Sequence, residues 1–116
     1  MYSFDKNVVL DFSDVRYYAD VHQILKKAFD FPAYYGENWD AFWDCMTDIA
    51  GMDGITVEIR GLRHLGEALP GMQTQLVQIL QEWKGYFGKD GENWVHIYVI
   101  EGSHETELTA IVPDDH

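Results

Sequence analysis

Hydrophobic and polar positions along this chain follow two periods, and each period predicts a different kind of element. Ile55, Val57 and Ile59 alternate with polar neighbours, which predicts a strand because successive strand side chains point to opposite faces of a sheet. Short apolar runs from Val8 to Phe12 and from Trp94 to Ile100 predict two further strands. The predicted strands are therefore spread over most of the chain.

Apolar residues at helical spacing fill the segments between these strands. One predicted helix has an apolar face made by Val21, Ile24, Leu25, Ala28 and Phe29. A later helix, which is expected to stop at Gly85, has an apolar face made by Met72, Leu76, Ile79, Leu80 and Trp83. A short helix is expected over residues 64–69, ended by Pro70 and Gly71.

The stretch from Pro32 to Cys45, PAYYGENWDAFWDC, predicts a loop followed by another helix. Pro32 ends the preceding helix, and Gly36 is expected to take a left-handed turn conformation, which glycine adopts at little steric cost. Asn38 is a good N-cap because its side-chain oxygen can accept a hydrogen bond from a free backbone N–H. The helix after it has the spacing of a buried stripe, made by Trp39, Phe42, Trp43 and Met46.

Asp40, Asp44 and Asp48 form a second stripe on the opposite side of this helix. Carboxylates four residues apart repel each other by roughly 0.2–0.5 kcal/mol per pair, and no lysine or arginine occurs between Ala28 and Ile59 to offset this. One interpretation is a solvated helix face. The other is a binding surface for a basic partner, which large amphipathic rings beside the charges favour. Those rings belong to Tyr34, Tyr35 and Trp43.

Strands separated by helices imply parallel pairing through right-handed crossovers, with helices covering the sheet. The predicted fold class is therefore α/β, a single domain over residues 1–116 with three parallel strands and about four helices. A turn from Glu101 to Ser103 is expected to lead into a short additional edge strand from Thr106 to Val112. Residues 51–54 are expected to form a turn, and residues 85–93 an exposed loop. The pattern does not fix the strand order.

The formal charge of −12 on 116 residues changes the choice of partners. It argues against nucleic acid, which is bound through lysine and arginine, and equally against an anionic membrane surface. It favours a cationic protein partner. The single cysteine, Cys45, excludes an intramolecular disulfide and is expected to be a packing residue in a reducing compartment. The sequence lacks a long apolar run and a recognisable signal peptide, so we expect a cytoplasmic location.

The run VHQILKKAFDFPAYYGENWDAFWDCMTD resembles the barstar family, the intracellular inhibitors of the bacterial ribonuclease barnase. The matching features are HQ-x-LKK, a following proline, YYGEN, and D-A-x-WDC with a threonine. Weaker similarity extends over most of residues 7–100. The resemblance implies a three-stranded parallel sheet with helices, and it implies a protein inhibitor rather than an enzyme, with neither a cofactor nor a metal.

The resemblance also implies a site. In that family the second helix and the loop before it plug the ribonuclease active site, where one aspartate takes the place of an RNA phosphate. By position, that aspartate is Asp44, and a second acidic contact is Asp40. The remaining partner-binding residues implied by position are Tyr34, Gly36, Asn38, Trp43 and, through the looser pattern LVQILQE, Glu82.

Some features depart from the family and leave other partners open. Trp39 replaces an aliphatic residue, and residues 102–116 form a C-terminal extension without a counterpart in barstar. Such changes are compatible with a different ribonuclease or another basic toxin as the partner. They are also compatible with a scaffold or regulatory module that has lost the nuclease.

A hydrolase is the alternative from another class. Glu37, Asp40, Asp44 and Glu82 would then bind Mg²⁺ or share acid–base work. However, the chain has no P-loop, GxSxG or GxGxxG pattern. Its histidines lack metal-ligand spacing and are expected to be packed or solvated: His22, His64, His96 and His104.

Overall fold

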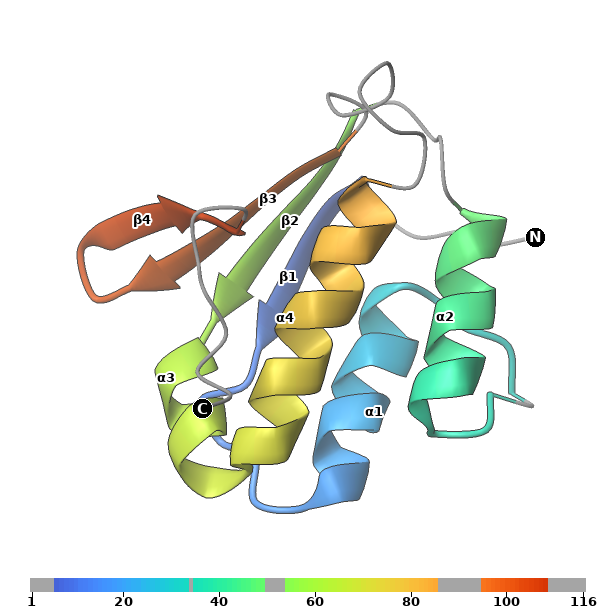
Figure 1. Ribbon diagram of the computed structural model, residues 1–116, viewed down its shortest axis with the longest axis horizontal. Helices are drawn as coiled ribbons and strands as arrows, with labels where there is room; N and C mark the ends of the chain where they lie inside the picture. The colour runs from blue at the N-terminus through green and yellow to red at the C-terminus, as the bar shows by residue number, and fades with distance from the viewer. Residues whose placement is uncertain (1–5, 34, 50–53, 86–94, 109–116) are drawn as a thin grey trace.

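The structure is a computed structural model, and it describes residues 6–33, 35–49, 54–85 and 95–108. Helices and strands alternate along these parts of the chain (Figure 1). The strands are β1 (Asn7–Asp11), β2 (Ile55–Arg60), β3 (Val95–Glu101) and β4 (His104–Glu107). The helices are α1 (Tyr18–Ala28), α2 (Trp39–Asp48), α3 (Leu62–Ala68) and α4 (Pro70–Lys84).

The sheet has the order β1-β2-β3-β4, with the first three strands parallel and β4 antiparallel to β3. The predicted α/β class with three parallel strands and four helices is therefore confirmed. Both crossovers step in the same direction along the sheet, from β1 to β2 and from β2 to β3. Because parallel crossovers are right-handed, two steps in one direction place all their helices on the same face. Figure 1 shows α1, α2 and α4 side by side on that face.

Burial along the strands shows the same one-sided arrangement. On β2 the side chains of Ile55, Val57 and Ile59 are buried, whereas the two between them are partly exposed. Val9 on β1 is 52% exposed, although Val8 and Leu10 on either side of it are buried. The apolar core therefore lies between the sheet and the helices, and the described side chains on the opposite face of the sheet are at least partly exposed.

Large side chains from three helices fill this core. Phe29, Phe42, Met46 and Trp83 are completely buried, and each contributes roughly 1.5–3 kcal/mol of transfer free energy. The indole N–H of Trp83 also donates to the backbone oxygen of Met46 at 2.7 Å. This bond connects the C-terminal half of α4 to α2, and it fixes the spacing of the two helices.

Pro70 follows the end of the short helix as predicted, but it also has a role that was not predicted. The short helix α3 begins at Leu62, two residues before the expected start at His64, and Pro70 opens α4 instead of only ending α3. Proline suits the first position of a helix because the N–H that it lacks has no partner there. Gly71 consequently lies inside α4, and α4 ends as predicted with its cap at Gly85.

The additional edge strand exists, but it lies earlier than predicted. β4 spans His104–Glu107 rather than Thr106 to Val112, and Glu101 belongs to β3, where it pairs with His104. The turn between β3 and β4 therefore consists of residues 102 and 103 alone, and Gly102 adopts a left-handed conformation in it, with φ 61°. Residues 109–112, 51–53 and 86–93 lie outside the described parts, so those loop and strand predictions remain untested. None of the described helices is long and apolar enough to cross a membrane.

Candidate functional site

Asn38 sets the start of α2, the helix that carries the acidic stripe. Its backbone is extended, with φ −140° and ψ 168°, and its Oδ1 accepts a hydrogen bond from the Ala41 N–H at 2.8 Å. The predicted N-cap is confirmed. Asn38 Nδ2 also donates to the backbone oxygen of Gly36 at 3.2 Å. The amide therefore fixes both the first turn of α2 and the loop in front of it.

The left-handed residue of this loop is Glu37, with φ 52°, and the prediction that assigned this conformation to Gly36 is wrong. The carboxylate of Glu37 accepts a bond from Gln23 Nε2 on α1 at 2.6 Å, which holds it in this conformation. Gly36 instead leaves room for the side chain of Asn38. A Cβ atom there would lie 3.2 Å from Asn38 Nδ2 and 3.6 Å from the Cβ of Ala41.

The buried face of α2 is rotated relative to the predicted stripe. Phe42 and Met46 are completely buried as expected, but Trp39 and Trp43 are only partly buried. Cys45 lies on the buried face as a packing residue, which agrees with the prediction made for it. The two tryptophans therefore lie at the boundary between the core and the acidic face, where their rings are accessible from outside.

Acidic side chains from two helices line one groove between α2 and α4. Asp40 and Asp44 contribute from α2, as predicted for an exposed acidic stripe, and Glu82 contributes from α4. The apolar part of the lining comes from Trp39, Trp43 and Ile79. This groove, of about 390 Å³, is called the acidic groove below.

The predicted site residues are thus largely brought together. Asp40, Trp43, Asp44 and Glu82 line the acidic groove, and Gly36 and Asn38 lie in the loop and cap that lead into α2. Tyr34 lies outside the described residues. Trp39 and Ile79 are groove residues that sequence reasoning did not select. The departure of Trp39 from the family pattern is the sequence signal that could have identified it.

The carboxylates of the acidic groove have no basic partner among the residues that the structure describes. Within residues 6–33, 35–49, 54–85 and 95–108, no ion pair or hydrogen bond involves the carboxylates of Asp40, Asp44 or Glu82. The same parts of the chain hold no group of three His, Cys, Asp or Glu side chains placed to bind one metal ion. The groove therefore presents unpaired negative charge beside aromatic rings, an arrangement suited to guanidinium and ammonium groups.

His22 supports the site from beneath. It is completely buried, its Nδ1 lies 2.6 Å from the hydroxyl oxygen of Tyr35, and its ring lies 4.8 Å from that of Trp39. Burial lowers the pKa of His22, and the nearby Glu37 carboxylate only partly opposes this. Tyr35 is itself buried, so it does not border the carboxylates at the surface as expected; burial raises the pKa of its hydroxyl.

The spacing of His22 relative to Leu25 and Phe29 is the sequence signal for its burial. These residues are separated by three and seven positions, which places them on one side of α1, and both apolar partners are completely buried. A histidine on an apolar face is ambiguous from sequence alone because its ring packs equally well at a surface. Here the ring is buried because Tyr35 of the loop and Trp39 of α2 pack against it.

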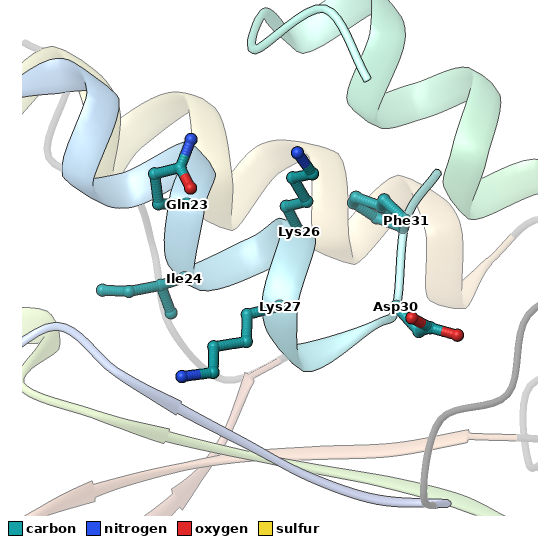
Figure 2. Close-up of a pocket in the computed structure, with 6 residues that line it drawn as sticks. All are labelled: Gln23, Ile24, Lys26, Lys27, Asp30 and Phe31. Carbon is teal, nitrogen blue, oxygen red and sulfur yellow. The ribbon is translucent and has the colours of Figure 1, made fainter. Parts of the chain in front are cut away.

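A separate cleft on α1 has the opposite charge. It is lined by Gln23, Ile24, Lys26, Lys27, Asp30 and Phe31. Figure 2 shows that the ammonium groups of Lys26 and Lys27 point to different sides of α1. The two charges therefore do not converge on one ligand, and the cleft does not extend the acidic groove.

Known proteins are similar to this chain over the part that contains the acidic groove. A family model described as Barstar (barnase inhibitor) matches residues 6–99. A protein of Bacillus subtilis (strain 168) named "Putative ribonuclease inhibitor YrdF" is 29% identical over 77 residues, which cover 66% of this chain and 84% of that protein. Every residue of the acidic groove lies within the family match, whereas β4 lies beyond its end.

Proposed function

This chain belongs to the barstar family, and on that premise we propose that it inhibits a basic ribonuclease of the barnase type by covering the active site of that enzyme. The observation that carries the proposal is the acidic groove, in which α2 and α4 together present Asp40, Asp44 and Glu82, and in which no described residue forms an ion pair with these carboxylates. The proposed role requires binding alone, so the chain itself acts without catalysis.

Asp44 is the proposed substitute for an RNA phosphate. A carboxylate accepts paired hydrogen bonds from a guanidinium group with nearly the geometry of a phosphate. Asp44 lies one helical turn after Asp40 and is exposed on the free protein, so it is hydrated until the partner arrives. Binding removes this water, which costs desolvation free energy. Well-aligned cationic groups of the enzyme must offset that cost.

The neighbouring residues have distinct proposed roles. Asp40 and Glu82 neutralise further cationic groups on either side of Asp44, and the Trp43 ring covers the contact from water. Asn38 has both side-chain ends engaged in the cap and the loop, which favours a positioning role for it. Gly36 keeps the loop close to α2, and Tyr34 is proposed as a contact from the resemblance alone.

The proposal is tested by titrating a barnase-type ribonuclease with this protein while RNA cleavage is followed. We expect stoichiometric inhibition by the wild type. Asp44→Ala is expected to weaken inhibition by about 30-fold or more, which corresponds to about 2 kcal/mol for one member of a buried charge pair. Asp14→Ala removes an exposed carboxylate outside the acidic groove and is the matched control.

Three results would count against the proposal in different ways. Equal losses for Asp44→Ala and Asp14→Ala would show attraction by overall charge instead of a specific site. Unchanged inhibition by Asp44→Ala would mean that the contact with the enzyme lies elsewhere on the molecule. If the wild type failed to inhibit, the ribonuclease would be the wrong target, and a different basic toxin would have to be sought.

A further inference from the structure

A second groove lies beside the acidic one, and its lining is mainly apolar. Tyr18 contributes from the first residue of α1, and Leu69, Pro70 and Met72 contribute from the junction between α3 and α4. Gln75 borders it one turn further along α4. This groove, of about 340 Å³, is called the apolar groove below.

The two grooves follow one another along one face of α4. Along α4, Gln75 borders the apolar groove and Ile79 lines the acidic groove, and residues four apart are neighbours on one helix face. On the other side, the ring of Tyr18 lies 5.2 Å from that of His22, which lies 4.8 Å from Trp39. The buried His22 therefore separates an aromatic residue of each groove.

An exposed aromatic ring distinguishes the apolar groove. In the described parts of the chain, the large hydrophobic side chains that are exposed are Val9, Tyr17 and Tyr18, and Tyr18 is 50% exposed. Tyrosine is enriched in protein interfaces because its ring buries apolar area while its hydroxyl remains hydrated. Exposed apolar surface beside a charged groove is typical of a binding site.

The acidic groove by itself is too small for a specific interface. It is lined by six residues, whereas a protein–protein interface of standard size takes about 20–30 residues from each partner. A protein seated over Asp44 must therefore contact surface beyond the acidic groove. The apolar groove lies on the same face of α4, where Gln75 is one helical turn before Ile79.

We propose that the basic protein bound at the acidic groove also inserts an apolar side chain into the apolar groove, with Tyr18 as the main contact. The inference rests on the proposed function, and it adds a chemical requirement for the partner. The cationic site of the partner must be flanked by an exposed aliphatic or aromatic side chain. Asp44 then provides the charge recognition and Tyr18 a contact that does not depend on charge.

Binding measurements on the full chain with a barnase-type ribonuclease test this inference. Tyr18→Ala removes the contact, and Gln75→Arg fills the groove from an exposed helix position that accepts arginine. Each is expected to raise the dissociation constant by about fivefold to tenfold, the range of a typical interface contact. Thr106→Arg adds the same charge on exposed β4, and Val9→Ala removes an exposed apolar side chain from β1; neither should change the dissociation constant.

Salt separates the two contacts. The loss caused by Asp44→Ala is expected to shrink as sodium chloride is raised, because salt screens the charge. The loss caused by Tyr18→Ala should stay constant over the same range. Tyr18→Ala could lower the melting temperature so far that its binding cannot be compared with that of the wild type. Binding by Gln75→Arg then tests the apolar contact, because Gln75 is exposed and its substitution leaves the core intact.

The failures of the two proposals are distinguishable. Binding that Asp44→Ala weakens, but that Tyr18→Ala and Gln75→Arg leave unchanged, would overturn the apolar contact and retain the acidic groove. A loss as large for Thr106→Arg as for Gln75→Arg would also overturn it, since overall charge would then explain the effect. Absence of any binding by the wild type would overturn both proposals.

Discussion

At the scale of single residues, His22 links the interior to the loop that carries the site. Its Nδ1 contacts the Tyr35 hydroxyl, while Nε2 has no hydrogen-bond partner among the described residues. Protonation would place an N–H on both ring nitrogens, and the one at Nε2 would be buried without an acceptor. The neutral ring therefore fits this site, in agreement with the lowered pKa of His22.

The first prediction concerns the pH dependence that follows from His22. A histidine whose pKa is lowered by folding binds fewer protons in the native state than in the unfolded state, so stability rises with pH where the two states differ. Its contribution is fully present above the ordinary histidine pKa of 6.5 and is lost as the pH falls from there toward the folded pKa. The free energy of unfolding of the wild type should therefore decrease from pH 7.5 to pH 5.

Denaturant unfolding of matched variants isolates this effect. His22→Gln is less stable at neutral pH but should lose less stability on acidification than the wild type does. His104→Gln, at an exposed position, should follow the wild type over the whole range. Equal acid sensitivity of the wild type and His22→Gln would show that another group controls the pH dependence.

Two glycines with positive φ provide a second residue-scale prediction. Gly61 has φ 74°, and a Cβ atom there would lie 2.4 Å from the backbone nitrogen of Ser13. Gly102 has φ 61° with no atom within 4 Å of such a Cβ. Gly102→Ala should cost about 1 kcal/mol for the left-handed conformation, whereas Gly61→Ala must also displace the backbone and should cost about 3 kcal/mol.

Urea unfolding of the two alanine variants measures the difference directly. The midpoint should fall much further for Gly61→Ala, with an unchanged slope. Similar midpoints for the two variants would mean that the contact between Gly61 and Ser13 relaxes freely.

At the scale of elements, the acidic groove depends on how α4 is held against α2. The bond from Trp83 Nε1 to the Met46 oxygen lies one residue after Glu82, so it fixes the part of α4 that faces Asp44. Trp83→Phe leaves a buried carbonyl without this donor and removes part of a packed ring. We expect a loss of about 2–4 kcal/mol in the free energy of unfolding.

The same substitution should weaken ribonuclease binding more than its distance from the surface suggests. Glu82 would lose its fixed position relative to Asp44, so the contribution of Glu82→Ala to binding should become smaller in the Trp83→Phe background. A double-mutant cycle measured by calorimetry gives this coupling. Strictly additive effects would show that Glu82 acts independently of the contact between α2 and α4.

Elements were predictable from the sequence where the apolar period was long and regular. The helices α1 and α4 and the strand β2 follow directly from such patterns, and Asn38 capped α2 as expected. The role of Pro70 as the first residue of α4 was not predicted, because proline is compatible both with the end of one helix and with the start of the next. The strand order was not predictable, since an apolar pattern specifies which face is buried but not which strand lies alongside.

The site was less accessible to pattern analysis than the fold. The acidic stripe of α2 follows from helical spacing, but Glu82 joins it only through the packing of α4 and was selected by resemblance alone. Glu37 takes the left-handed conformation because Gln23 and Asn38 hold the loop, and neither contact is visible as a local pattern. Long-range contacts therefore account for most of what the sequence did not predict.

At the scale of the whole molecule, the charge of −12 should control the rate of association. Attraction between a strongly acidic inhibitor and a basic enzyme raises the association rate at low salt. Between about 50 mM and 500 mM sodium chloride we expect the association rate constant to fall by about tenfold or more, with a much smaller change in dissociation. Stopped-flow mixing with the ribonuclease measures both, and a salt-independent association rate would contradict an electrostatic approach.

We propose that the acidic groove occupies the place of RNA in the active site of the enzyme. The apparent inhibition constant of the wild type, measured at increasing concentrations of an RNA substrate, tests this directly. We expect this constant to rise linearly with substrate concentration, as for a competitive inhibitor, and Asp44→Asn to have a higher inhibition constant with the same competitive pattern. An apparent inhibition constant that does not change with substrate would place the protein elsewhere on the enzyme and would rule out occupation of the RNA site.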